Sequence, residues 1–277
     1  MRGGGFCVIY PFEMDRIKTT IKDGRFPEEI MQMLQGAEVY DSSCSAEAKV
    51  FFVDKDGGLF IKEAGAGSLK NEAAMTAFYH SKGLSAEVLY YGTHEGKDYM
   101  VTSRIPGEDC INEMYLDDPE RLCDLWAELL RALHETDAAG CPVTDRIDTY
   151  KKAVKSGFGG QYYEPDLFTG LWEFGSFDDA MKAAKEGLGE LRSEALIHGD
   201  YCLPNVILDD WKFSGYIDLG NGGIGDRHID ILWGIWTLKY NLGTDMCTER
   251  FIDVYGRDAV DFEKLRAVAA MEMVGKT

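Results

Sequence analysis

The sequence predicts an α+β protein of two lobes, with a β-rich N-terminal part and a larger, mainly helical C-terminal part. Hairpin signals gather before residue 104, amphipathic helices dominate after residue 118, and Pro106-Gly107 interrupts the pattern between them. We therefore expect an N-terminal lobe over residues 1–103 and a C-terminal lobe over 104–277, joined near residues 103–107. Such an arrangement favours a ligand site between the lobes.

The N-terminal lobe should contain two hairpins and one helix. Strands at 48–53 and 59–62 flank an Asp-Lys-Asp-Gly-Gly turn, and strands at 87–92 and 98–103 flank a second turn. Apolar residues at helical spacing predict a helix over 69–82, which Ser68 would cap and Gly83 would end.

Short strands and long helices alternate in the C-terminal lobe. The helix at 119–135 has the clearest apolar face, made of Leu122, Leu125, Trp126, Leu129, Leu130 and Leu133. Further elements are expected as helices at 177–192, 229–241, 247–255 and 261–273 and as short strands at 195–197, 206–208 and 213–217. Residues 157–175, rich in glycine and aromatics, read as a long loop or insertion.

Composition excludes several classes of protein. The chain has 277 residues, 45% of them hydrophobic, which is enough for an ordinary globular core. Seven scattered cysteines without a CxxC pair argue against a zinc site or a disulfide scaffold and favour a reduced, cytoplasmic setting. A net charge of −19 argues against nucleic-acid binding and would attract cationic ligands, although it also serves solubility.

The ends and the association state give weaker expectations. No apolar run is long enough for a membrane span, and the short apolar stretch at 6–12 lacks the flanks of a signal peptide. Residues 1–13 are expected to be a disordered extension, with Met14 as an alternative start. We expect a monomer or weak dimer that binds no membrane.

The densest chemical motif is the run HGDYCLPN at 198–205, in a loop between two short strands. HGD alone is often a polar turn, but here Asn205 follows five residues after Asp200, and Asp218 lies in an Ile-Asp-Leu-Gly unit that ends the next strand. Phosphoryl transfer needs a carboxylate to accept the hydroxyl proton and oxygen ligands for Mg²⁺. We therefore predict Asp200 as catalytic base and Asn205 and Asp218 as metal ligands.

A second piece of kinase chemistry lies upstream. Lys62 ends a predicted strand, and Glu72 falls in the first turn of the following helix. A strand-end lysine is usually a solvated charge. Ahead of the HGDxxxxN motif, however, this pair is typical of a lysine that grips nucleotide phosphates and a glutamate that holds it.

With these motifs in place, the chain resembles the aminoglycoside 3′-phosphotransferases, within the aminoglycoside/choline kinase superfamily. The resemblance rests on LIHGDYCLPNVILDDWKFSGYIDLGNGGIGDRHIDILWGIWTL (196–238), YGRDAVDFEKLR (255–266) and SAEAKVFFVDKDGGLFIKEA (45–64). It implies a two-lobed fold like that of the protein kinases, with ATP or GTP as phosphate donor and Mg²⁺ as cofactor. No long activation segment follows Asp218, and the loop at 42–48 lacks GxGxxG, so a protein kinase itself is excluded.

The resemblance implies further roles by position. Ser45 would contact the phosphates, and the backbone at Ser103 and Ile105 would meet the adenine. A segment behind the site, containing Asp226, Arg227 and Asp230, reads as a buried ion-pair network.

The acceptor substrate is a small hydroxylated or cationic molecule, with an aminoglycoside as the first hypothesis. Where the family carries an acidic pair that grips ammonium groups, this chain has Tyr240 and Asn241, and Glu272 is the remaining acid near the C-terminal end. Three acids of the 157–175 loop either compensate or are solvated surface groups: Glu164, Asp166 and Glu173. The alternatives are a kinase of choline, homoserine or a sugar-like metabolite, and a non-catalytic nucleotide-binding protein.

Overall fold

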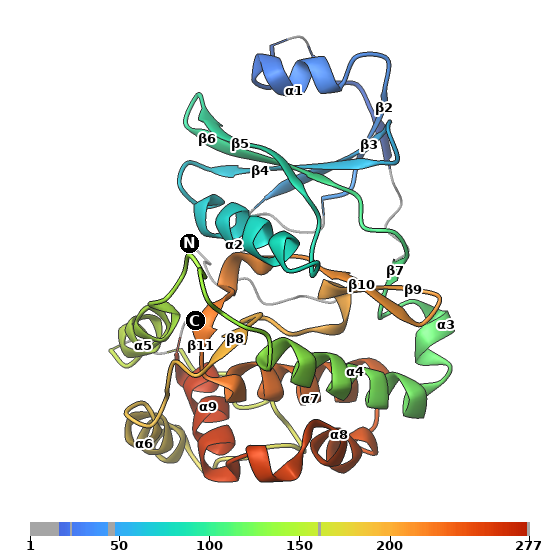
Figure 1. Ribbon diagram of the computed structural model, residues 1–277. Coiled ribbons are helices and arrows are strands. Elements are labelled where there is room, and N and C mark those ends of the chain that lie inside the picture. The colour runs from blue at the N-terminus through green and yellow to red at the C-terminus, as the bar shows by residue number, and fades with distance from the viewer. Residues whose placement is uncertain (1–16, 23, 44–47, 160–161, 276–277) are drawn as a thin grey trace. The chain divides into compact units, whose positions relative to one another are not determined.

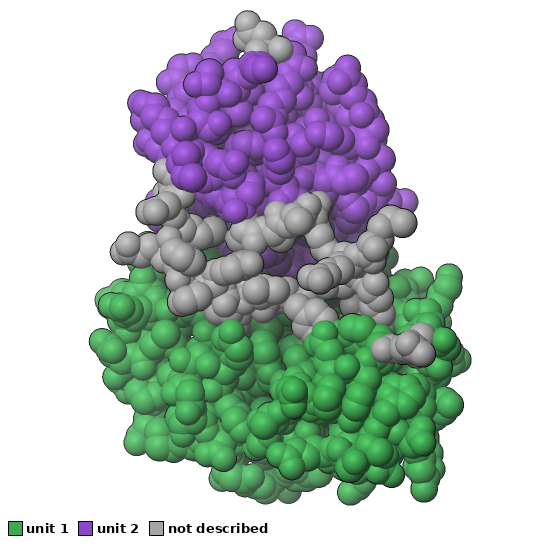
Figure 2. Space-filling view, turned by 180° about the vertical axis from the view of Figure 1, so that it is seen from behind, with its two compact units in different colours: residues 1–4, 108–213, 221–277 green, residues 5–107, 214–220 purple. Residues whose placement is uncertain are grey.

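The computed structural model describes residues 17–22, 24–43, 48–159 and 162–275 (Figure 1). The expectations for residues 1–13, Met14 and Ser45 lie outside these ranges. The described residues divide into two compact units, coloured separately in Figure 2. The N-terminal unit comprises the described residues up to 107 together with 214–220, and the C-terminal unit comprises 108–213 and 221–275.

The segment 214–220 groups with the N-terminal unit, although the sequence prediction places it in the C-terminal lobe. Its backbone explains why. The Tyr216 N–H donates to the Leu84 carbonyl at 2.8 Å, the Ser85 hydroxyl donates to the Tyr216 carbonyl, and the Tyr216 ring packs edge-on against Tyr79. A stretch distant in sequence thereby becomes part of the first unit.

An antiparallel sheet of six strands, with two helices, forms the N-terminal unit. Its order is β1-β2-β3-β4-β6-β5. The elements are β1 (Ile17–Thr19), α1 (Glu28–Met33), β2 (Glu38–Asp41), β3 (Lys49–Asp54), β4 (Leu59–Gly65), α2 (Lys70–Ser81), β5 (Val88–His94) and β6 (Lys97–Ser103). Both predicted hairpins and the helix are confirmed, but β4 continues to Gly65, so Lys62 lies inside the strand and not at its predicted end. β1, α1 and β2 are too short and irregular in pattern to have been predicted.

Alternation along β4 decides which side chains reach α2. Ile61 is buried on the face that α1 covers, in one core with Ile30. Lys62 is next in the strand and so points to the opposite face, as does Met100, its partner in register on β6. Met100 packs there against Ala73 of α2. The strand pleat therefore carries Lys62 to the α2 side of the sheet.

The prediction that Ser68 caps the start of α2 is wrong, whereas the prediction that Gly83 ends the helix is confirmed. The Ser68 hydroxyl donates back to the Gly65 carbonyl, so it does not cap the helix. Instead the Leu69 N–H donates to the Asp98 carboxylate from β6 at 3.1 Å. Gly83 follows the helix at φ +74°, a left-handed conformation that glycine adopts without steric cost.

Helices dominate the C-terminal unit. Its elements are β7 (Glu108–Asp109), α3 (Glu113–Leu116), α4 (Pro119–His134), α5 (Arg146–Gly157), α6 (Phe177–Gly187), β8 (Ala195–Ile197), β9 (Val206–Asp209), β11 (Gly223–Gly225), α7 (Arg227–Leu242), α8 (Cys247–Tyr255) and α9 (Phe262–Val274), with β10 (Lys212–Tyr216) passing into the other unit. All five predicted helices are confirmed, although α6 ends before residue 192. In the described part of the 157–175 loop, residues 162–175 form turns without a helix or strand, as predicted.

Two small sheets frame the predicted catalytic loop. β8, which leads into it, pairs antiparallel with β11, and β9, which follows it, lies between β7 and β10. The β9–β10 turn places Asp210 and Trp211 at φ +48° and +64°, as a tight right-twisted hairpin requires. None of the helices in the described residues has the length and apolarity that crossing a bilayer would demand.

Candidate active site

The backbone of the predicted catalytic loop is held by one buried carboxylate. The N–H groups of His198 and Gly199 donate to the two oxygens of Asp230, each at 2.7 Å. Asp230 comes from the first turn of α7 and is fully buried. Charge-assisted bonds of this length are among the stronger hydrogen bonds in proteins, so the start of the loop is fixed to α7.

Asp200 follows directly and is half-buried. The Asn205 amide nitrogen Nδ2 donates to the Asp200 carbonyl at 2.9 Å and to its Oδ2 at 3.1 Å. The Cys202 thiol approaches the other carboxylate oxygen at 3.4 Å. These contacts orient the Asp200 carboxylate and occupy Asn205 Nδ2, so Oδ1 is the Asn205 atom that could serve as the predicted metal ligand.

The rest of the loop is anchored on α4 and α7. Tyr201 stacks on Trp126 with ring centroids 4.0 Å apart, and its hydroxyl donates to the Trp126 carbonyl. The Trp126 indole in turn donates to the Gly234 carbonyl of α7. Further on, the Leu203 N–H donates to the Thr237 hydroxyl at 3.2 Å. Because residues on both sides of Asp200 are bonded to α4 or α7, Asp200 sits on a well-held support.

Replacing Gly199 by alanine should destabilise the C-terminal unit and lower any activity that depends on the loop. Gly199 has φ +79°, and an added Cβ would lie 2.0 Å from the Asn221 carbonyl oxygen. The left-handed conformation alone costs about 1–2 kcal/mol for an L-residue, and the backbone clash adds to it. Urea unfolding should show the loss, whereas Gly189→Ala, where an added Cβ meets nothing, should unfold like the parent.

Lys62, Glu72 and Asp218 meet in the N-terminal unit. The Lys62 ammonium lies 2.7 Å from Glu72 Oε1 and 2.6 Å from Asp218 Oδ1. Burial disfavours the charge, but attraction to Asp218 and Glu72 outweighs it and raises the pKa of Lys62 above its ordinary value. Lys62 therefore stays cationic, which suits a group that contacts phosphate oxygens.

Asp218 is the most accessible member of this trio, with half of its side chain exposed. It adopts φ +56°, which is uncommon for a residue other than glycine. Strained backbone conformations of this kind concentrate where a side chain must be aimed at a ligand. An exposed carboxylate oxygen is also a ligand that Mg²⁺ prefers.

The two predicted hinge residues also lie in the N-terminal unit. The Ser103 N–H donates to the Glu87 carbonyl, and its hydroxyl accepts from the Glu87 N–H, both at 3.0 Å. Ile105 packs over Gly215, where an added Cβ would lie 2.7 Å from Ile105 Cδ1. Since the Ser103 N–H is occupied, an adenine contact at this residue would use its carbonyl.

The variable loop contacts the C-terminal turn of α9 through its backbone at Glu164, one of the candidate substrate acids. The Glu164 N–H donates to the Met273 carbonyl at 3.0 Å, next to Glu272. Glu272 is buried, and its carboxylate accepts a 2.6 Å hydrogen bond from the Tyr150 hydroxyl. Glu164 is half-buried. The contact is thus between backbones, and of the two acids Glu272 is the enclosed one.

The other substrate candidates are placed elsewhere. Asp166 and Glu173 are exposed, and Glu173 accepts from the Gly170 N–H within its own turn. Tyr240 is 54% exposed and stacks on Trp236 at 5.1 Å. The Asn241 amide bonds back to Thr237, one turn earlier in α7.

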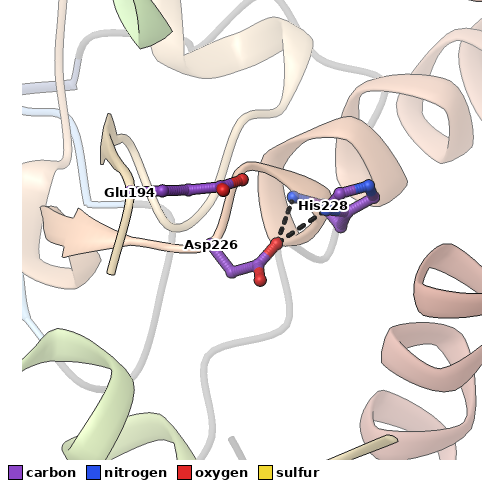
Figure 3. Close-up of side chains that lie close together, drawn as sticks. All are labelled: Glu194, Asp226 and His228. Atoms are coloured by element: carbon purple, nitrogen blue, oxygen red, sulfur yellow. Dashed lines mark hydrogen bonds and ion pairs between the residues drawn. The ribbon is translucent and has the colours of Figure 1, made fainter. Parts of the chain in front are cut away.

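Behind the catalytic loop, Glu194, Asp226 and His228 lie close together (Figure 3). A carboxylate–histidine group of this kind has the composition of a metal site, but its polar atoms serve the fold. His228 donates from Nδ1 to Asp226 at 2.7 Å, and its Nε2 accepts a hydrogen bond from the Asp261 N–H. Asp261 is the residue that caps α9. Glu194 pairs with Arg227 at 2.9 Å. The segment is the predicted structural network.

Asp226→Asn should lower stability at neutral pH, with a loss that fades in acid. Burial opposes the charge, but hydrogen bonds from His228 and the Arg192 N–H lower the pKa of Asp226 from 3.8 to about 2. The folded state therefore favours the ionised carboxylate of Asp226. This preference contributes about 2 kcal/mol to the free energy of unfolding above pH 4, and the contribution disappears as the pH falls to about 2. Urea midpoints of both proteins at pH 7 and pH 3 measure the difference; equal gaps at the two pH values would contradict it.

Several supporting residues could not be identified from the sequence. His134 bridges the Tyr255 hydroxyl at 2.8 Å and Asp230 at 3.3 Å, entirely inside the C-terminal unit. His134 and Tyr255 position Asp230, which binds the predicted catalytic loop, and Thr237 binds the loop directly. These side chains come from three separate helices, so no local sequence spacing predicts that they lie together.

Comparisons with known proteins agree with this geometry. The profile of a phosphotransferase enzyme family matches residues 43–268. The chain is 41% identical, over 91% of its length and 95% of the relative's, to a probable aminoglycoside 3′-phosphotransferase of Lactococcus lactis. An aminoglycoside 3′-phosphotransferase of Niallia circulans is 28% identical over 87% of this chain and 94% of its own. An aminoglycoside phosphotransferase structure from Streptomyces rimosus superposes with a TM-score of 0.71 at 20% identity, covering 90% of this chain and 96% of the other.

Proposed function

The chain belongs to the phosphotransferase enzyme family, and we propose that it transfers the γ-phosphoryl group of ATP to the 3′-hydroxyl of an aminoglycoside. The observation that carries this proposal is the held carboxylate of Asp200. It is oriented by Asn205 on a loop whose backbone is bonded to buried Asp230. The names of the relatives support the acceptor, and the ATP requirement agrees with the cytoplasmic setting expected from the cysteines.

In the proposed reaction, Asp200 accepts a proton from the acceptor hydroxyl. The hydroxyl oxygen forms a bond to the γ-phosphorus, the bond from that phosphorus to the bridging oxygen breaks, and ADP leaves with the electron pair. The proton stays on the Asp200 carboxylate until product release. Positioning supplies much of the catalysis in such a loose transition state, which accounts for the many bonds that hold this loop.

Mg²⁺ fits the donor set of this chain. Asn205 offers a neutral carbonyl oxygen and Asp218 an exposed carboxylate, both hard ligands, and Mg²⁺ needs few protein ligands when phosphates and waters complete its shell. When bound, Mg²⁺ would offset the negative charge of the β- and γ-phosphates. Lys62, kept cationic by Glu72, would contact the phosphates beside it.

Of the candidate acids near the end of α9, Glu164 is half-buried and free of the burial that encloses Glu272 against Tyr150, so it is the proposed contact for an ammonium substituent of the acceptor. A charge-assisted hydrogen bond to an ammonium contributes about 1.5–3 kcal/mol. Tyr240 and Asn241 carry no charge for such a contact. Glu164→Gln should therefore raise KM for an aminoglycoside with little change in kcat, since its bond would be the same in ground and transition states.

The position of phosphorylation tests the proposal. Kanamycin B and its 3′-deoxy counterpart differ at one hydroxyl, so we expect MgATP-dependent phosphate incorporation into the first and none into the second. Proton and phosphorus NMR of the product would locate the ester. Equal incorporation into both compounds would overturn the 3′ assignment, and GTP replacing ATP at equal rate would revise the donor.

A further inference from the structure

Two cysteines from different helices meet in the C-terminal unit, away from Asp200. Cys123 of α4 and Cys247, the first residue of α8, are both buried. The Cys123 thiol donates to the Cys247 carbonyl oxygen at 3.4 Å, so the two cysteines are in direct contact. The two helices pack against each other, so the contact belongs to the fold and not to a loop.

A surface cavity leads to this pair. It measures about 450 Å³. Its lining consists of Glu120, Asp124, Met246, Cys247, Arg250 and Asp253, together with Val254. Arg250 is fixed there by two 2.6 Å bonds to Asp124. Cys247 thus borders a cavity that a small polar oxidant can enter, whereas Cys123 is not among the residues that line it.

The two thiols differ in their electrostatic setting. The largest effect on Cys247 is the hydrogen bond from Cys123, and the attraction of Arg250 adds to it. Together they outweigh burial and the repulsion of Glu120 and Asp124, so the pKa of Cys247 is lowered to about 7. The same hydrogen bond and burial raise the pKa of Cys123. Thiolate is the reactive form of cysteine, so Cys247 is the nucleophile of the pair.

We propose that Cys247 and Cys123 form a peroxide-sensitive thiol pair that closes to a disulfide between α8 and α4. The Cys247 thiolate attacks one oxygen of a hydroperoxide, the O–O bond breaks, and a sulfenic acid and hydroxide (or alkoxide) result. The Cys123 sulfur then attacks the sulfenic sulfur, losing its proton as water leaves. The cysteines are oxidised by two electrons in total and the peroxide is reduced by two. In a reducing cytoplasm the pair remains a dithiol.

The proposal is independent of the acceptor substrate, and peptide mapping of the full-length protein tests it. After a brief exposure to submillimolar hydrogen peroxide, non-reducing digestion should yield one cross-linked species joining the peptides that contain residues 123 and 247, reversed by dithiothreitol. Two thiols should disappear from the seven of the chain. Formation of a different disulfide, or no loss of thiols until all cysteines react together, would overturn it.

Variants separate the two roles. Cys123→Ser should leave Cys247 as a sulfenic acid that dimedone traps, and Cys247→Ser should abolish both the cross-link and the dimedone adduct. Cys141→Ser, another buried cysteine, should behave as the parent does. Dimedone labelling of Cys123 in the Cys247→Ser protein would contradict the assignment of Cys247 as nucleophile.

Discussion

Replacing Asp200 by asparagine should lower kcat by about 10²–10⁴, the range expected when a general base is removed. Asparagine has the same shape, and its carbonyl oxygen still accepts from Asn205 Nδ2, so the loop should keep its conformation. The backbone bonds from His198 and Gly199 to Asp230 do not involve the replaced side chain. The loss should therefore fall on kcat, with little change in nucleotide binding or in the thermal midpoint.

Asp210→Asn is the matched control for this prediction. This substitution also removes one negative charge. Asp210 lies exposed in the β9–β10 turn at a left-handed φ that asparagine tolerates. We expect it to retain the kcat of the parent. An Asp200→Asn protein that keeps full kcat, measured at saturating substrate beside this control, would remove Asp200 from the chemistry.

Replacing Asp218 by asparagine should reduce turnover by about 10² or more, because a metal ligand can contribute several kcal/mol to transition-state stabilisation. Asparagine suits the φ of +56° at this position, so the backbone should remain as it is. Lys62 loses one of its two carboxylate partners and keeps Glu72 at 2.7 Å. The substitution thus weakens the negative ligand while the fold is retained.

The dependence on Mg²⁺ distinguishes a metal ligand from a partner that merely positions Lys62. If Asp218 binds the metal, the Mg²⁺ concentration for half-maximal rate should rise in the asparagine variant, and added Mg²⁺ should recover part of the lost rate. Glu72→Gln serves as the comparison, since it also removes a carboxylate from Lys62. An unchanged Mg²⁺ requirement in Asp218→Asn would contradict the ligand role.

Much of this arrangement was predictable because local patterns encode it. Period-two alternation in β4 places Lys62 on the face opposite to Ile61, and a glycine at residue 83 ends α2 as predicted. The spacing of Asp200 and Asn205 within one short loop brings them into contact. Each of these features depends on residues that are near one another in sequence.

Other features depend on contacts between distant segments and left no local sign. Ser68 does not cap α2, and β6 instead brings the Asp98 carboxylate beside the Leu69 N–H, just before the helix. The segment 214–220 joins the N-terminal unit through backbone bonds to Leu84. Glu272 is a candidate substrate acid by sequence, yet it is buried against Tyr150. The periodicity of apolar residues along the sequence cannot predict contacts of this kind between distant segments.

The most direct test of the central claim is a coupled assay of ADP formation with MgATP and a panel of kanamycin, neamine, choline and simple sugars, run on the parent and on Asp200→Asn. We predict turnover that depends on the aminoglycoside and that falls by about 10²–10⁴ in the variant. Turnover with choline or a sugar alone would place the acceptor in another class. Binding of ATP without turnover on any compound would contradict the assignment of an active phosphotransferase.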